Sequence, residues 1–405
     1  MNPCLKPFKN QHPLNMINTL RKAAVILAIL LMLMPETVSS QATDTRVLLT
    51  DNLQHKLDSI TQKGLVPGVT FAVCFSNGQT TSLASGYADV ELQQPMKPNS
   101  IMFTGSVGKT FVAAIILQLV DEGSLVLDEL ASKYLDGQAW FHQIPNAQSI
   151  TIRMLLNHTA GIPEWAFQPG VWESVHNDPD KTWTAEERMS KVIGLQPSNP
   201  AGKGWSYADS HYIILGAIIE QLTGNDYYNE LSKRILKPYG LTNTTPAVQR
   251  FLPGLVAGYT SLSNELLLPK KVAENQTYAF NPQLEWTGGG LVTNVSDLCV
   301  WAKIVWSGKL FAQHTYNQMI TAVPFKTGLF EDAGYGLGCF VGSTNGTSYY
   351  GHTGFVPGYI TFVQYIPEFG VSLAMQFTSD ASHTDVYMKQ FFNTLKETIL
   401  IASGI

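Results

Sequence analysis

The sequence SVGKTFVAAIILQLV occupies residues 106–120 and joins a serine and a lysine to a long apolar run. Its last ten residues contain one polar side chain, Gln118, and Gly123 follows soon after, which predicts a buried helix. Ser106 and Lys109 stand three residues apart, so on a helix their side chains would share one face. A structural alternative is a helix-capping serine beside a lysine whose amine reaches solvent. A lysine in so apolar a segment is unusual without a function, which favours a catalytic pair.

The composition predicts a globular protein with a large core, built as one large domain or two fused ones. The chain has 405 residues, of which 45% are hydrophobic and 14% charged. Without residues 1–40 it would carry 22 basic and 30 acidic residues, so no nucleic acid is expected as a partner. Beyond residue 40 the cysteines are odd in number and lie in apolar segments, so we expect buried thiols at Cys74, Cys299 and Cys339. The sequence contains no HExxH or CxxC motif, so no metal site is expected.

Residues 1–40 have the layout of a secretory signal peptide. Arg21 and Lys22 precede an apolar run over 23–34, and small polar residues follow it. The run is too short to span a bilayer comfortably, which disfavours the alternative of an uncleaved membrane anchor. Met16 would open a shorter basic segment, so translation could begin there. We therefore expect a secreted or periplasmic protein with no stable membrane span once the signal is removed.

The expected elements run from strands through helices and back to strands. Hairpin signals and periodicity predict the following: a helix over 47–62, strands over 68–75 and 80–86, mainly helices over 106–241 with one at 211–222, loops and short strands over 242–285, a helix over 296–306, strands over 334–342, 348–353, 359–366 and 371–377, and a closing helix over 384–400. Strands at both ends favour an α/β (α+β) fold, with one sheet from both termini flanked by helices and a mainly helical lobe inserted. The α/β lobe would consist of about residues 45–105 and 285–405, and the helical lobe of about residues 106–284.

Three further segments carry polar side chains of the kinds that hydrolases use. The sequence GWSYAD at 204–209 precedes the helix expected at 211–222, which places Tyr207 at a helix entrance. The sequence GHTG at 351–354 lies in a C-terminal strand, and NHTAG occupies 157–161.

In this order and spacing, the chain resembles the serine penicillin-recognising superfamily, which contains class C beta-lactamases, DD-carboxypeptidases and related esterases and D-aminopeptidases. The resemblance covers about residues 47–400. It includes IRMLL at 152–156, WTGGG at 286–290 and YGLG at 335–338. It implies a beta-lactamase/transpeptidase-like fold with an antiparallel sheet, and one catalytic domain over 41–405.

Three other segments match known motifs by spelling but not by position. KTG at 326–328 falls in an expected loop, whereas the family's triplet lies on a strand, as 352–354 does. The YYN of 227–229 lies inside an expected helix, where a packing tyrosine is the better interpretation. GSVGKT at 105–110 is similar to a phosphate-binding loop, but the required first glycine is replaced by Phe103.

The resemblance implies covalent catalysis without a cofactor. Ser106 would be the nucleophile, and Lys109 would take its proton if the apolar helix lowers the pKa of the amine. Tyr207 would protonate the leaving group and later activate water. Which of Lys109 and Tyr207 is the general base stays open. The backbone N–H groups of Ser106 and Phe355 would form the oxyanion hole.

Two residues depart from the pattern that is usual in the family. Asp209 replaces an asparagine, and because a carboxylate cannot donate, acylamide recognition should weaken. It could hold Lys109 charged, meet a substrate amine, or serve as a helix N-cap. His352 replaces a lysine and is largely neutral at pH 7, so Thr353 and Gly354 would carry more of the substrate contact. His158 is expected to be structural.

Both departures favour a DD-peptidase-like or esterase-like hydrolase over an efficient beta-lactamase. The expected partner is a small molecule or peptide, such as a D-alanyl peptide, a beta-lactam or an ester. A class C type beta-lactamase is the alternative within the family. An alternative of another class is a catalytically silent binding module, which the presence of Ser106, Lys109 and Tyr207 together disfavours.

Overall fold

The computed structural model describes residues 37–64, 66–325, 333–344 and 346–381. The unit that carries the candidate site runs from Leu53 to Leu395, while residues 1–52 and 396–405 form a second unit. The predicted closing helix at 384–400 and most of the predicted signal peptide lie outside the described residues. Among the helices that are described, none is long and apolar enough to cross a membrane.

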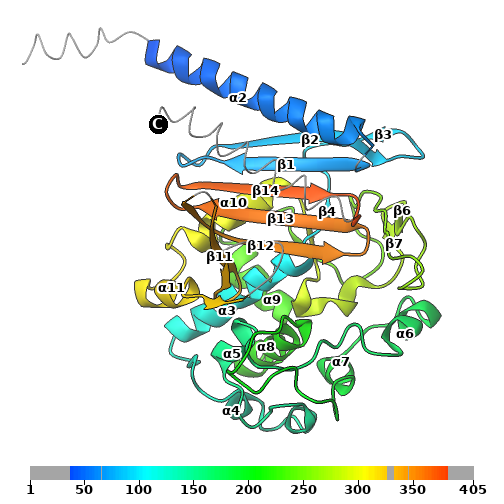
Figure 1. Cartoon of the computed structure of the whole chain (residues 1–405), viewed down its shortest axis with the longest axis vertical. Coiled ribbons are helices and arrows are strands. Elements are labelled where there is room, and N and C mark those ends of the chain that lie inside the picture. Colours follow the sequence, from blue (N-terminus) through cyan, green and yellow to red (C-terminus); the bar gives the residue numbers. More distant parts are fainter. Residues whose placement is uncertain (1–36, 65, 326–332, 345, 382–405) are drawn as a thin grey trace, which may run out of the picture. The chain divides into compact units, whose positions relative to one another are not determined.

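One large sheet is built from both ends of the chain, and every neighbouring pair of its strands is antiparallel. Its order is β3-β2-β1-β14-β13-β12-β11-β10-β9, and Figure 1 shows β1, β14, β13 and β12 side by side. The strands are β1 (Gly68–Cys74), β2 (Thr80–Asp89), β3 (Gln94–Pro95), β9 (Val323–Pro324), β10 (Gly334–Tyr335), β11 (Phe340–Thr344), β12 (Thr347–Val356), β13 (Tyr359–Ile366) and β14 (Val371–Phe377). The predicted fold class is confirmed.

The first strand pairs directly with the last one, which explains why neither terminus alone could build this sheet. Val69 lies opposite Phe377 and Val73 opposite Leu373. Every residue of β1 and β14 is buried, as expected for strands covered on both faces. Continuous apolar runs at both ends of the chain therefore specify the centre of the sheet.

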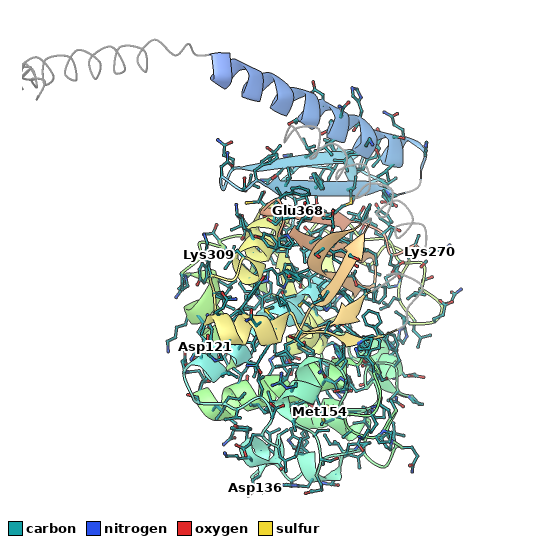
Figure 2. All side chains as sticks on the ribbon, turned by 60° about the vertical axis from the view of Figure 1, so that its left-hand side comes forward. Asp121, Asp136, Met154, Lys270, Lys309 and Glu368 are labelled. Atoms are coloured by element: carbon teal, nitrogen blue, oxygen red, sulfur yellow. The ribbon has the colours of Figure 1, made fainter. Side chains whose placement is uncertain are left out.

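Helix α2 (Thr37–Gln62) precedes the first strand, and the other described helices lie in the chain between the N-terminal and the C-terminal strands of the large sheet. These are α3 (Gly108–Asp121), α4 (Ser132–Leu135), α5 (Ile152–Leu156), α6 (Val171–Asn177), α7 (Ala185–Ser190), α8 (Asp209–Thr223), α9 (Tyr227–Leu231), α10 (Val295–Trp306) and α11 (Gln313–Met319), with short turns η1 (Gly105–Val107), η2 (Phe141–Gln143), η3 (Ser232–Leu236), η4 (Pro282–Leu284) and η5 (Trp286–Gly288). Helix α8 packs against α3, α4, α5 and α7, and α10 packs on β1, β13 and β14. Side chains fill the space between these helices and the sheet (Figure 2).

Helix α3 connects the sheet layer to the helical part. Residues 108–117 of α3 are all buried. The indole of Trp301 on α10 stacks on Phe111 with ring centroids 4.2 Å apart, and its Nε1 donates to the Thr110 hydroxyl at 2.8 Å. Full burial of an apolar helix on all sides holds its first turn in place, and this turn adjoins Ser106.

Among the described residues, five short strands lie outside the large sheet, and three of them, β5 (Thr245–Pro246), β6 (Ala273–Glu274) and β7 (Thr277–Tyr278), fall in the segment 242–285 that was predicted to contain loops and short strands. Strand β8 (Leu291–Thr293) pairs with β4 (Met102–Phe103) and β5. Strands β6 and β7 form a separate pair. The N–H of Thr104 also donates to the Leu291 carbonyl at 2.9 Å, so pairing with β8 holds the chain directly before the turn that contains Ser106.

The strands β2 and β12 each extend three residues beyond the predicted ends at 86 and 353, and two other predicted elements differ more. The first helix begins at Thr37 rather than at 47. The strand predicted over 334–342 is two strands, β10 and β11, separated by residues 336–339. There the N–H groups of Leu337 and Gly338 donate to the carbonyls of Met319 and Leu156, so the backbone bonds to the helical part and leaves the sheet.

Candidate active site

Ser106 and Lys109 meet as the spacing predicted. Lys109 Nζ lies 2.9 Å from Ser106 Oγ. Ser106 lies in η1, one turn before α3 begins at Gly108, so the two side chains share a face across this junction. Gly105 precedes the serine with a φ of 50°, a conformation that favours glycine.

The turn that holds Ser106 lies against strand β12. A Cβ on Gly105 would lie 2.5 Å from the Phe355 nitrogen, and a Cβ on Gly354 would lie 1.9 Å from the Thr104 carbonyl oxygen. Two glycines therefore permit a backbone approach that side chains would block. This approach brings the N–H of Phe355 beside the residue that precedes Ser106, which is the neighbourhood an oxyanion hole made by Phe355 and Ser106 requires.

Lys109 is fully buried and is held as a cation. Its Nζ lies 2.5 Å from Asp209 Oδ1 and donates to the Gly288 carbonyl at 2.6 Å. Burial lowers the pKa of this amine, but the interactions with the Asp209 carboxylate and with Tyr207 together outweigh burial and raise the pKa above its ordinary value. The prediction that the apolar helix lowers the pKa of Lys109 is therefore wrong, because the compensating charge comes from a distant part of the sequence.

Asp209 is the first residue of α8, and the N-cap is Ala208, which offers no side-chain cap. The N-cap interpretation of Asp209 is therefore wrong, and its carboxylate pairs with Lys109 instead. The Asp209 side chain is 20% exposed. It can thus be reached from solvent while it compensates the buried ammonium.

Tyr207 lies over the lysine. Lys109 Nζ is 5.1 Å from the centroid of the Tyr207 ring. The Tyr207 hydroxyl is buried and makes no hydrogen bond of good geometry to the described residues, although Ser106 and Lys109 are close enough to lower its pKa. Burial dominates and raises the pKa of Tyr207 to about 12, so the phenol is protonated at neutral pH.

His352 is 2% exposed, and both of its ring nitrogens have partners. Nδ1 lies 2.6 Å from the Thr353 carbonyl, so Nδ1 carries the proton. Nε2 therefore accepts from the Tyr335 hydroxyl at 2.8 Å. Burial and the charge of Lys109 lower the pKa of His352 to about 3, so the residue carries no charge at neutral pH. Thr353 and Gly354 follow it on β12, and the backbone of Gly354 closely approaches Thr104 and Gly105, which directly precede Ser106.

Two carboxylates near the lysine were not singled out from the sequence. Glu164 accepts the backbone N–H of Asp209 at 2.6 Å and that of Ala166 at 2.8 Å. Burial and the Asp209 charge raise the pKa of Glu164 to about 7 and that of Glu285 to about 8. Both glutamates lie within apolar stretches, and Glu285 directly precedes the WTGGG turn, which is the signal that could have identified them.

The residues that were set aside or expected to be structural lie as expected where the structure describes them. Tyr227 is 1% exposed in α9 and packs against Tyr228 and Trp286. Lys326 lies outside the described residues. The three cysteines predicted to be buried are free buried thiols, at positions 74, 299 and 339.

Comparison with known proteins gives a consistent relationship. The family model described as Beta-lactamase matches residues 52–392. The chain is 26% identical over 333 residues to penicillin-binding protein 4 of Amycolatopsis lactamdurans, covering 80% of this chain and 83% of the relative. It is 26% identical over 326 residues to the D-aminopeptidase of Brucella anthropi, covering 80% of this chain and 58% of the relative. The chain spans less than two thirds of the length of this D-aminopeptidase and of other curated relatives.

A solved structure shares the architecture. The D-stereospecific amidohydrolase from Streptomyces sp. is 26% identical, with a TM-score of 0.72, and the match covers 82% of this chain and 96% of that one.

Proposed function

Because the chain belongs to the beta-lactamase family of serine hydrolases, we propose that it cleaves an amide or ester through a Ser106 acyl-enzyme, and that its preferred acyl group carries a free amine. Amides, esters or short peptides of D-amino acids are the proposed substrates. The observation that carries this proposal is the group of three acidic side chains near Lys109, the hydrogen-bond partner of the reacting serine: Asp209, Glu164 and Glu285.

Glu285 is the carboxylate best suited to a substrate amine. Asp209 is already paired with Lys109, and Glu164 accepts two backbone N–H groups. Glu285 is half-buried, and its carboxylate makes no hydrogen bond or ion pair to the residues that the structure describes. It is nonetheless close enough to Asp209 and Lys109 for both charges to shift its pKa. With a pKa of about 8, Glu285 is largely protonated in the empty site at neutral pH, and a substrate ammonium would favour its ionised form and supply the partner that the carboxylate lacks.

The neutral His352 argues against substrates that present a carboxylate. A D-alanyl-D-alanine terminus and the common beta-lactams carry a carboxylate, for which a cation is the natural partner. The uncharged ring of His352 uses both nitrogens internally, as described above. DD-carboxypeptidase and class C type beta-lactamase activities are therefore expected to be weaker than hydrolysis of amine-bearing amides and esters. A catalytically silent binding module has no need for the ion pair beside an intact serine.

The names of two relatives agree with this substrate class. One is a D-aminopeptidase, and the similar solved structure is a D-stereospecific amidohydrolase. An aminopeptidase acts beside a free amino terminus, so its substrate carries the amine that we propose for this chain.

The proposed chemistry begins with the hydrogen bond between Ser106 and Lys109. As Lys109 passes one proton to Asp209 along the 2.5 Å contact, its amine accepts the proton of Ser106, whose oxygen attacks the substrate carbonyl. The backbone N–H groups of Ser106 and Phe355 stabilise the resulting oxyanion. The Tyr207 hydroxyl donates its proton to the departing amine or alcohol as the carbonyl–leaving group bond breaks. The Tyr207 oxygen then recovers a proton from the Lys109–Asp209 pair, and water releases the acyl group.

The experiment compares matched substrates with and without the amine. We expect kcat/KM for D-alanine p-nitroanilide to exceed that for its N-acetyl form by about 10- to 100-fold, the effect of one charge-assisted hydrogen bond. Glu285→Gln should remove most of this preference while leaving hydrolysis of the N-acetyl form unchanged. Glu186→Gln, at an exposed position, is the control. Equal rates on the two substrates, or faster turnover of N-acylated D-alanyl-D-alanine, would overturn the amine proposal.

We also propose that the protein is exported. The support is the apolar run over 23–34 behind Arg21 and Lys22. The test is the N-terminal mass of protein recovered from the medium and from the periplasmic fraction. A chain that retains residues 23–34 in the cytosolic fraction would contradict export.

A further inference from the structure

We propose that His158, oriented by His211, is a positioning residue that fixes Tyr207 for proton donation to the leaving group. The sequence predicted a structural role for His158, and the contacts give it a more specific one. The proposal rests on the proposed function, because it assumes that Tyr207 is the general acid.

His158 holds the backbone on both sides of Tyr207. The N–H of Ser206 donates to the His158 carbonyl at 3.0 Å, and the N–H of Ala208 donates to His158 Nδ1 at 3.3 Å. The imidazole also lies on the tyrosine ring, with ring centroids 4.2 Å apart and planes tilted by 34°. His158 thus restrains the backbone on both sides of Tyr207 and also its ring.

This restraint is needed because the Tyr207 hydroxyl has no well-aligned hydrogen bond among the described residues: Ser106 and Lys109 lie close enough to lower its pKa, but neither contact has good geometry. Its direction toward Ser106 and Lys109 therefore depends on packing and on the segment 206–208. A proton donor in a hydrolase must lie within hydrogen-bond reach of the leaving atom, so small rotations of this ring would reduce the rate.

The pair of histidines has a single consistent arrangement of protons. His211 Nε2 accepts the N–H of Ile162 at 3.3 Å and therefore carries no proton. A neutral His211 then carries its proton on Nδ1 and donates it across the 2.8 Å contact to His158 Nδ1. His158 Nδ1 thus accepts from both His211 and Ala208. The hydrogen bond from His211 makes Nδ1 the acceptor nitrogen of His158, and it orients the imidazole against Tyr207.

The environment keeps both rings neutral. Burial lowers the pKa of His158 well below its usual range, with contributions from His211, Lys109 and His352, and it lowers the pKa of His211 to about 3. His158 Nε2 has no hydrogen-bond partner, and its ring is surrounded by Tyr207, Tyr212 and Tyr335. Protonation would place a second charge on this aromatic cluster, so the arrangement is constant at working pH.

The backbone of His158 adopts a conformation that side chains rarely adopt. Its φ is 61°, in the left-handed region, where asparagine is tolerated better than most residues. His158→Asn therefore keeps the backbone and supplies an oxygen near the position of Nδ1 that can accept the Ala208 N–H. His158→Ala removes both the acceptor and the ring. The two variants form a matched pair for a test.

The test uses two leaving groups on one acyl group. D-alanine p-nitroanilide releases an amine that must be protonated, whereas D-alanine thiophenyl ester releases a thiolate that needs no proton. Tyr207→Phe and His158→Ala should each lower kcat/KM, which reports on the steps through acylation, by about 10- to 100-fold on the anilide, within the range of general acid catalysis, and by less than about threefold on the thioester. His158→Asn should recover part of the anilide rate. In the Tyr207→Phe background, His158→Ala should add less than about twofold, because both changes act through one hydroxyl.

The outcomes separate the two proposals. If Tyr207→Phe lowers kcat/KM on both substrates equally, Tyr207 is not the general acid, and both the positioning role of His158 and the general-acid step of the proposed function fail. A second outcome is that Tyr207→Phe lowers kcat/KM on the anilide much more than on the thioester, as expected. If His158→Ala then lowers kcat/KM on both substrates equally, or adds its full effect in the double variant, only the positioning role of His158 is overturned. Thermal unfolding and circular dichroism check that each variant is folded. If His158→Ala does not fold, the test uses His158→Asn and His211→Ala and compares kcat/KM on the thioester with kcat/KM on the anilide. A ratio equal to that of the wild type in both variants would overturn the proposal.

Discussion

Lys109 Nζ and Asp209 Oδ1 lie 2.5 Å apart, and this ion pair joins the first turn of α3 to the first turn of α8. The lysine is fully buried, so without a partner its charge would be costly. With the partner, Lys109 is a cation in the resting enzyme, and proton removal from Ser106 must be coupled to proton transfer toward Asp209. The departure from asparagine at this position therefore changes the chemistry of the site as well as its charge.

Asp209→Asn should weaken both the fold and the reaction. Removing one partner of a buried pair leaves the Lys109 ammonium uncompensated, so we expect the free energy of unfolding to fall by about 1–3 kcal/mol. Asp128→Asn is the matched control, because Asp128 pairs with Arg153 at 2.6 Å but is 70% exposed, and its loss should change stability by less than about 1 kcal/mol. Urea denaturation of both variants measures the difference. An equal decrease in the free energy of unfolding in both variants would show that the buried ion pair stabilises the fold no more than the exposed one.

Ser106→Ala should abolish hydrolysis and leave the fold intact. Loss of the nucleophile is expected to reduce kcat by about 10⁴-fold or more. Intact-protein mass spectrometry with a fluorescent penicillin, a chromogenic ester and a D-alanyl-D-alanine peptide should give an adduct only in chains that keep Ser106, and its lifetime separates slow from fast deacylation. Ser124→Ala, at an exposed position, should behave as wild type. Residual activity of Ser106→Ala at the wild-type level would refute acylation at this serine.

His352→Ala should impair acylation, whereas Lys326→Ala should not. The imidazole accepts from Tyr335 and donates to the carbonyl of Thr353, so its loss leaves two buried groups without partners beside the serine. We expect about a tenfold reduction of kcat/KM on one reporter ester, corresponding to about 1.4 kcal/mol. The reverse result, with Lys326 as the sensitive position, would assign the substrate triplet to 326–328 instead of 352–354.

Stability should depend on pH through Glu285. The pKa of Glu285 is raised to about 8, so the native protein holds a proton that the unfolded chain has already lost near neutral pH. The free energy of unfolding should therefore fall as pH rises from 7.5 to about 8.5, a range above the ordinary pKa of histidine in which the buried histidines are largely neutral in both states. Glu285→Gln should flatten this slope, and Glu186→Gln should not. Chemical denaturation at pH 7.5, 8 and 8.5 measures it, and identical slopes in all three proteins would contradict the prediction.

Sequence reasoning recovered the features that depend on local patterns. The strands at 68–75, 359–366 and 371–377 and the helix at 296–306 agree closely with β1, β13, β14 and α10, because their apolar periodicity is long and uninterrupted. The split between β10 and β11 was missed, because it depends on hydrogen bonds to Met319 and Leu156 that no local pattern reveals.

The sequence by itself determined the family, the serine–lysine pair and the layout of strands around a helical middle, since motif spacing and periodicity act over a few residues. Only the tertiary structure decided the charge of the site. The pKa of Lys109 depends on Asp209, and the group of three acidic side chains near Lys109 is completed by Glu164 and Glu285, which reach the same place from separate loops. Electrostatic interactions depend on distance and burial in space, and neither can be read from separation along the chain.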